Sequence, residues 1–147
     1  MVMSDASLTL RRTIRASRAR LFRLWTEPAE LVKWFNAPEH GLASAELDLR
    51  VGGTYRLGMR KLPDGEPFYV RGEYREIDPP KRIAFTWTWD SPGDAQNTLV
   101  TVDLIEVPGG TEVRITHELF ANQKQVESHT AGWSAILESL AEYSEGE

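Results

Sequence analysis

Apolar and polar residues alternate near the start of the chain, which is the pattern of a half-buried strand. Leu8, Leu10 and Ile14 fall on one side, and Thr9 and Thr13 fall on the other. Successive side chains of a strand point to opposite faces, so this period of two places the three apolar residues on one face. The sequence therefore predicts a first strand that ends near residue 14.

A helical period follows this strand twice. Ser17 is placed to cap a first helix, and Pro28 is placed in the first turn of a second. The apolar positions of both helices are spaced mostly by three or four residues, and they are Leu21, Leu24 and Trp25, followed by Leu31, Trp34 and Phe35. Two short helices in a row are predicted.

Between Ala45 and Leu119 the period returns to two, and turn signals divide the segment into six strands. The turn signals are Gly52-Gly53, Asp64-Gly65, Asp78-Pro79-Pro80, Ser91-Pro92-Gly93-Asp94 and Pro108-Gly109-Gly110. The intervals are too short for crossover helices, so consecutive strands are expected to pair as antiparallel hairpins.

One side of these six strands is apolar and is expected to face the core. It is formed by Ala45, Leu47, Leu49, Tyr55, Leu57, Met59, Val70, Gly72, Tyr74, Ile83, Phe85, Trp87, Trp89, Val100, Val102, Leu104, Val113, Ile115 and Leu119, with His117 among them. The other side carries charged residues and threonines, including Thr86 and Thr88, and is expected to face water.

The last segment, from Gln123 to about Tyr143, is helical again. Its stripe is formed by Val126, His129, Thr130, Trp133, Ile136, Leu137, Leu140 and Tyr143. Asn122 is placed to cap this helix, and residues 144–147 are expected to fray. A helix of this length spans roughly 30 Å, enough to cross a twisted sheet.

Gly132 lies inside this predicted helix, where glycine is unfavourable. We expect that a close approach of the helix to the sheet, or a kink beside a pocket, explains the glycine.

Composition narrows the class of protein. The 147 residues show no linker or repeat, so we expect a single domain over 1–147 with its core at about 7–143. The net charge of −5 and the lack of a basic block argue against nucleic acid as a partner. No apolar run is long enough to span a membrane, no secretion signal is visible, and the cytoplasm is the expected location.

Four motifs together resemble a known family. They are 50–56 (RVGGTYR), 72–83 (GEYREIDPPKRI), 85–87 (FTW) and 129–133 (HTAGW), and the resemblance covers nearly the whole chain. They are similar to the branch of the SRPBCC (START-like) superfamily named for the activator of a heat-shock chaperone ATPase. The resemblance implies an α+β helix-grip fold, in which an antiparallel curved sheet of about seven strands wraps a long C-terminal helix, with two short helices. Members of the superfamily hold lipids, hormones or polyketides between sheet and helix.

The inward aromatic residues allow two interpretations. Aromatic rings dominate ordinary cores and could simply fill the space under the helix. Alternatively, they line a cavity that binds a small hydrophobic or aromatic molecule, because ligand pockets are mostly apolar with few polar groups. The second interpretation is favoured because the resemblance adds to the composition. Its expected ligand-binding residues are Tyr55, Tyr74, Phe85, Trp87, Trp89, His117 and Trp133.

Catalytic chemistry has little support in the sequence. His117 could act as a general base in a cyclase or hydrolase that uses the same cavity, although an inward histidine is more often a satisfied core residue. His40, His117 and His129 show no paired spacing, and the chain has no cysteine, so no metal site is expected. No motif for a cofactor is present. Whether the protein is an enzyme stays open.

Protein partners are suggested by two features. The branch name suggests a module that contacts a chaperone ATPase, although this chain has no room for the second domain of that co-chaperone. Edge strands and an exposed aromatic residue near Phe35 or Phe68 would offer an interface for a homodimer.

Overall fold

The seven strands found among the described residues form one antiparallel sheet. The computed structural model describes residues 6–37, 39–62, 64–90 and 97–145. Its elements are β1 (Leu8–Ile14), α1 (Arg18–Thr26), α2 (Pro28–Trp34), β2 (His40–Leu47), β3 (Thr54–Lys61), β4 (Pro67–Asp78), β5 (Arg82–Trp89), β6 (Thr98–Val107), β7 (Gly110–Glu118) and α3 (Gln123–Glu145). The strand order is β1-β7-β6-β5-β4-β3-β2, so β2 to β7 pair in sequence as predicted and β1 adds to β7 at the edge.

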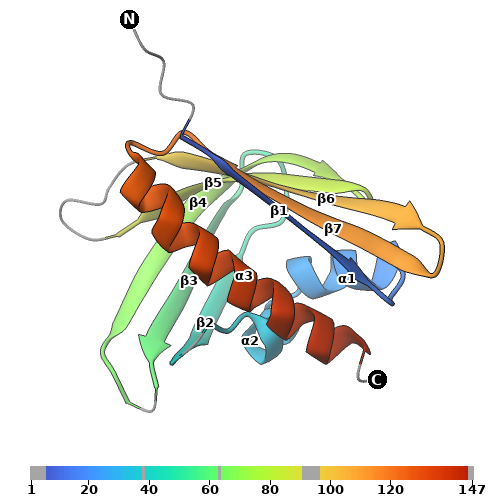
Figure 1. Ribbon diagram of the computed structural model, residues 1–147. Coiled ribbons are helices and arrows are strands. Elements are labelled where there is room, and N and C mark those ends of the chain that lie inside the picture. Colours follow the sequence, from blue (N-terminus) through green and yellow to red (C-terminus); the bar gives the residue numbers. More distant parts are fainter. Residues whose placement is uncertain (1–5, 38, 63, 91–96, 146–147) are drawn as a thin grey trace, which may run out of the picture.

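The sheet curls around the long helix. Figure 1 shows α3 running across the face of the sheet, with α1 and α2 beside its C-terminal half. Strands β6 and β7 alternate between buried and half-buried positions, and Val100, Val102, Val113 and Ile115 are fully buried. Because the period of two places these side chains on the face that α3 covers, the core forms between sheet and helix, and the predicted α+β helix-grip fold is confirmed.

Side-chain caps begin α1 and α3 as predicted, whereas the C-terminal end of α3 differs from the prediction. The Ser17 hydroxyl accepts a hydrogen bond from the main-chain N–H of Arg20 at 3.1 Å. The Asn122 side chain accepts one from the main-chain N–H of Gln125 at 2.9 Å, at the start of α3. The far end of α3 does not fray at Ser144, which is buried and donates to the Leu140 carbonyl.

Three sequence predictions at strand ends are wrong. Leu119 is 59% exposed because β7 ends at Glu118 and the positive φ of Leu119 (73°) turns its side chain out of the alternation. Leu49 lies beyond the end of β2 and is exposed. The second strand begins at His40 and not at Ala45. The predicted turn at 91–94 lies outside the described residues.

The outer face of β5 was predicted to face water, and this prediction is wrong. Thr86 and Thr88 are both buried. The pairing of β4 with β5 shifts register between Tyr74 and Glu76. Beside this irregularity, side chains replace part of the main-chain ladder. The Tyr55 hydroxyl donates to the Thr86 carbonyl at 2.6 Å, and the Thr86 hydroxyl accepts from the main-chain N–H of Glu73 at 2.8 Å. The buried Thr86 hydroxyl is therefore hydrogen-bonded to the neighbouring strand.

Candidate functional site

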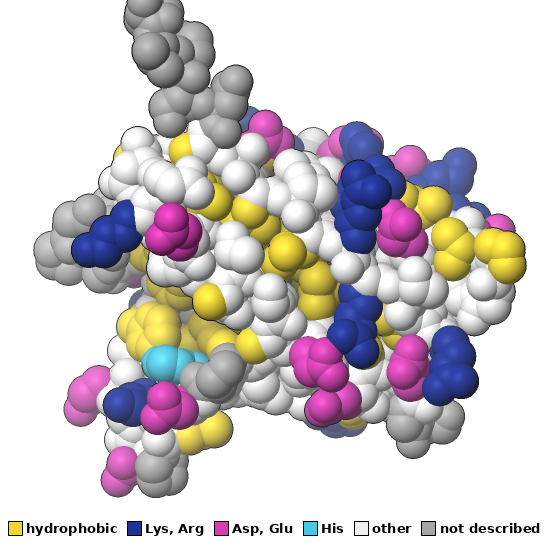
Figure 2. All heavy atoms as spheres, viewed as in Figure 1, with side chains coloured by type: hydrophobic (Ala, Val, Ile, Leu, Met, Phe, Trp, Pro, Cys, Tyr) yellow, Lys and Arg dark blue, Asp and Glu magenta, His cyan; other side chains and the backbone are white. Residues whose placement is uncertain are grey.

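A cavity of about 510 Å³ lies between the N-terminal half of α3 and the sheet. We call it the aromatic cavity, and it is lined by Phe35, Ala37, His40, Met59, Phe68, Trp87, Trp89, Thr98, Phe120, Gln125, Ser128, His129, Gly132, Trp133 and Ile136. Its volume lies within the range of about 300–1,000 Å³ that is typical of small-molecule sites. Figure 2 shows hydrophobic side chains gathered between α3 and the β3–β4 hairpin, on the side where the cavity opens.

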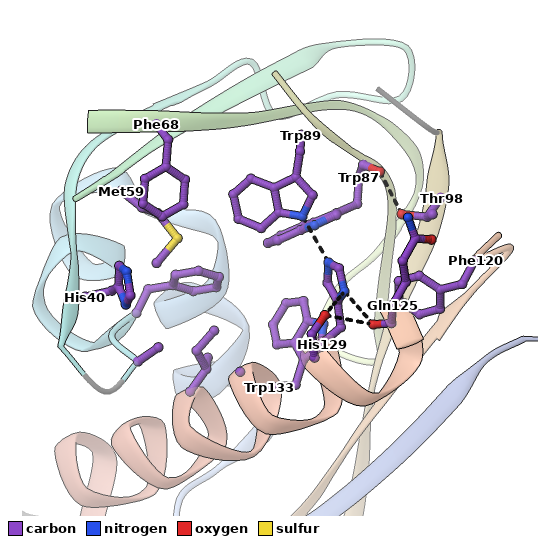
Figure 3. Close-up of a pocket in the computed structure, with 15 residues that line it drawn as sticks. His40, Met59, Phe68, Trp87, Trp89, Thr98, Phe120, Gln125, His129 and Trp133 are labelled. Atoms are coloured by element: carbon purple, nitrogen blue, oxygen red, sulfur yellow. Dashed lines mark hydrogen bonds between the residues drawn. The ribbon is translucent and has the colours of Figure 1, made fainter. Parts of the chain in front are cut away.

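Three tryptophans form the wall of the aromatic cavity (Figure 3). Trp87 and Trp89 lie two positions apart on β5, so both point inward, and their rings meet edge to face with centroids 5.5 Å apart. Trp133 comes from α3 and packs against Trp87 with a centroid distance of 5.2 Å. Trp87 and Trp133 are almost fully buried, whereas Trp89 is half-buried. The wall is therefore built by helix and sheet together.

Phe35 completes the wall, although it is not among the ligand-binding residues predicted from the sequence. It follows α2, is only 2% exposed, and its ring lies 5.9 Å from that of Trp133 and 6.5 Å from that of Trp87. The expectation that an aromatic near Phe35 is exposed for a homodimer is therefore wrong for Phe35 itself. Phe68 is 37% exposed and lies on the cavity wall.

His117 lies behind the tryptophan wall and is hydrogen-bonded to it. The Trp133 indole N–H donates to His117 Nδ1 at 3.0 Å, and Nε2 lies 2.8 Å from the Thr98 hydroxyl. That hydroxyl donates its own proton to the Trp87 carbonyl at 2.7 Å, so it accepts from His117, whose proton is on Nε2. The chain of hydrogen bonds thus links α3 to β7, β6 and β5.

The environment of His117 keeps its imidazole neutral. The side chain is fully buried, and this burial, together with the neighbouring His129, lowers its pKa to about 3. Both ring nitrogens are engaged by protein groups, and His117 does not line the aromatic cavity. An imidazole in this position supports the tryptophan wall and has no free nitrogen for a bound molecule.

His129 makes a second indole–imidazole pair, which the sequence did not reveal. The Trp89 indole N–H donates to His129 Nε2 at 2.9 Å, and His129 Nδ1 lies 2.8 Å from the Gln125 carbonyl, which it can only approach as a donor (Figure 3). This pair ties β5 to the first turns of α3 at the cavity. The rings of His117 and His129 are 5.2 Å apart, although 12 positions separate them in the sequence. Within the part of the chain that the structure describes, no cluster of His, Asp and Glu could hold a metal ion.

The seven predicted ligand-binding residues fall into three places. Trp87, Trp89 and Trp133 line the aromatic cavity. Tyr55, Tyr74 and Phe85 line a separate void of about 20 Å³, which is large enough for one water molecule. Burial raises the pKa of both tyrosines, so their phenols are protonated. Phe35 and Trp87 line both spaces, and His117 lines neither.

Sequence reasoning missed the cavity residues that lie outside the inward aromatic row. They are Phe35, Ala37, His40, Phe68, Phe120, Gln125, Ser128, His129, Gly132 and Ile136, with Met59 and Thr98 from the strands. One signal was available, because Gln125, Ser128, His129, Gly132, Trp133 and Ile136 follow a helical spacing and share one face of α3. The remaining residues come from the ends of different elements and carry no common period.

Comparisons with known proteins bear on this architecture. Residues 15–145 match the family described as "Activator of Hsp90 ATPase homolog 1-like protein". The chain belongs to this family. A comparison with curated proteins found no match.

Solved structures similar to this chain extend over nearly its whole length. Protein CV1439 from Chromobacterium violaceum has 26% identity and a TM-score of 0.85, with 95% of this chain and 97% of that one covered. A protein from Rhizobium leguminosarum has 28% identity and a TM-score of 0.79, with 98% and 97% covered. An AHSA1-like protein from Aeromonas hydrophila shares the fold, with 22% identity, a TM-score of 0.79 and coverage of 95% and 92%.

Among the described residues, no helix combines the length and the apolar character that a membrane span requires.

Proposed function

We propose that this protein binds a small hydrophobic or aromatic molecule in the aromatic cavity. The observation that carries the proposal is a cavity of about 510 Å³ whose walls are mainly aromatic rings from β5, α3 and the end of α2. The cavity opens at one side of the molecule, and its volume is within the range of small-molecule sites, so a small ligand can enter it and fit there. Apolar walls with few polar groups favour an apolar occupant.

Native mass spectrometry on gently purified protein tests the proposal directly. We expect a discrete adduct, which denaturation releases for identification. In parallel, the uncharged fluorescent probe N-phenyl-1-naphthylamine is titrated into the protein, and the emission of the probe reports binding. We expect saturable binding at one site per chain.

Two variants locate the site. Trp89→Ala removes a half-buried wall residue, and the loss of one aromatic contact, about 1.5–3 kcal/mol, should weaken probe binding by about 10- to 100-fold. Tyr69→Ala is the matched control, because Tyr69 is an aromatic residue of β4 that stacks under Arg56 and does not line the cavity. Equal binding by both variants, or a wild-type protein with neither adduct nor probe binding, contradicts the proposal.

A further inference from the structure

A glycine interrupts the face that α3 presents to the aromatic cavity. Gly132 lies within the helix Gln123–Glu145, and its neighbours on the same face, Ser128, Trp133 and Ile136, also line the cavity. Glycine disfavours a helix interior more than any residue except proline. A glycine at this position therefore needs a reason in the surroundings of the helix.

Neither packing nor backbone conformation supplies that reason. A Cβ atom added at Gly132 would meet nothing within 4 Å, so the predicted close approach of helix and sheet is wrong. At Gly72, by contrast, an added Cβ would lie 1.9 Å from the Thr86 carbonyl oxygen. Gly132 also lacks the positive φ that Gly52 and Gly109 adopt. What lies beyond Gly132 is the open space of the cavity.

The polar groups of the cavity indicate which molecules suit this space. None of the described residues that line it is Asp, Glu, Lys or Arg, so a charged occupant would be buried without a counter-charge. The Gln125 side-chain oxygen accepts from the main-chain N–H of Ala121 at 3.0 Å, which leaves the amide NH₂ as a donor. This amide group can donate to an uncharged ligand.

We propose that Gly132 is a specificity-determining residue that lets an uncharged aromatic ligand lie directly against the main chain of α3. The inference rests on the proposed function, because it assigns the ligand to the aromatic cavity. A side chain at position 132 occupies space that the ligand ring needs, whereas glycine leaves that space open at the expense of helix stability. The helix is thus less stable than it would be with alanine at position 132, and the cavity keeps the space that the ligand occupies.

The test compares two probes and three variants. N-phenyl-1-naphthylamine is uncharged, and 8-anilinonaphthalene-1-sulfonate has the same rings with an added sulfonate. We expect the wild type to bind the uncharged probe at least about 10-fold more tightly, since burying an unpaired charge is costly. Gly132→Ala should weaken binding of the uncharged probe by about 10-fold, the usual effect of one methyl-sized change in an apolar pocket. Gly132→Leu should abolish it.

Thermal unfolding separates loss of space from loss of folding. Gly132→Ala should raise the melting temperature by about 2–4 °C, because alanine favours the helix and meets no atom. Ala131→Leu is the control, since Ala131 is exposed on the same helix and does not line the cavity, and it should leave binding unchanged. If Gly132→Leu does not fold, Gly132→Ala decides the question.

The two proposals fail in different ways. Wild-type protein that binds neither probe and carries no adduct overturns the proposed function, and the role of Gly132 with it. Wild-type protein that binds the uncharged probe while Gly132→Ala and a folded Gly132→Leu bind it equally well overturns only the role of Gly132. Equal affinity for the sulfonated and uncharged probes overturns the assignment of an uncharged ligand.

Discussion

Replacing His117 by leucine tests whether the imidazole behind the tryptophan wall is neutral in the folded protein. Leucine has no acceptor, so the Trp133 indole N–H loses its partner in the core. An unpaired buried donor costs about 1–3 kcal/mol, and the free energy of unfolding at pH 7 should fall by about 2 kcal/mol. Packing changes add to this loss in the same direction.

The deficit should shrink as the pH falls. The pKa of His117 is about 3 in the folded protein, against an ordinary value of 6.5, so between these values only the unfolded chain takes up a proton. Wild-type protein therefore has the full contribution above pH 6.5 and loses about 1.4 kcal/mol of it per pH unit below that. The leucine variant has no such titration, so a deficit of about 2 kcal/mol should vanish near pH 5.

Urea unfolding of both proteins, followed by circular dichroism from pH 7.5 to 4.5, measures this difference. Titrations of other groups occur in both proteins and cancel in the comparison. His117→Asn is the control, because its side-chain oxygen can still accept from Trp133 and the amide does not titrate. Its free energy of unfolding at pH 7 should fall less than that of His117→Leu. Its dependence on pH should match that of His117→Leu. A deficit that stays constant from pH 7 to 4.5 would refute the neutral, buried state of His117.

Two further predictions concern the scaffold of the cavity. Asn122→Ala removes the cap from the main-chain N–H of Gln125 and should lower the free energy of unfolding by about 1 kcal/mol, read from the urea midpoint; an unchanged midpoint would show that the cap is not needed. Gly72→Ala places a Cβ 1.9 Å from the Thr86 carbonyl oxygen and 2.5 Å from the Tyr55 ring, so we expect a loss of more than about 3 kcal/mol or no soluble protein. A variant that melts within about 2 °C of wild type would contradict the close approach of the strands there.

The local periods of the sequence were enough to predict the elements and much of the core. Ser17 and Asn122 were recognised as helix caps, and both accept the expected hydrogen bonds. The inward positions of Trp87 and Trp133 followed from alternation on a strand and a stripe on a helix, and both are buried. These predictions succeeded because capping, alternation and helical spacing depend on neighbours within a few positions of each other.

The same periods could not show how the inward residues divide along the concave face. Tyr55, Tyr74 and Phe85 share the side of the sheet that Trp89 occupies, yet the wall of Phe35 and Trp87 separates their small void from the aromatic cavity. A period of two gives the face of a sheet and leaves the position along that face undetermined. The homodimer and the contact with a chaperone stay predictions.

The sequence by itself determined the number and order of the strands and helices and most of their apolar faces, because these properties come from side-chain spacing along the chain. Only the tertiary structure decided that Phe35 lines the cavity, that Trp89 pairs with His129, and that open space lies beyond Gly132. Each of these depends on how a curled sheet, a helix end and a crossing helix pack together. That packing joins residues far apart in the chain, and no local pattern records it.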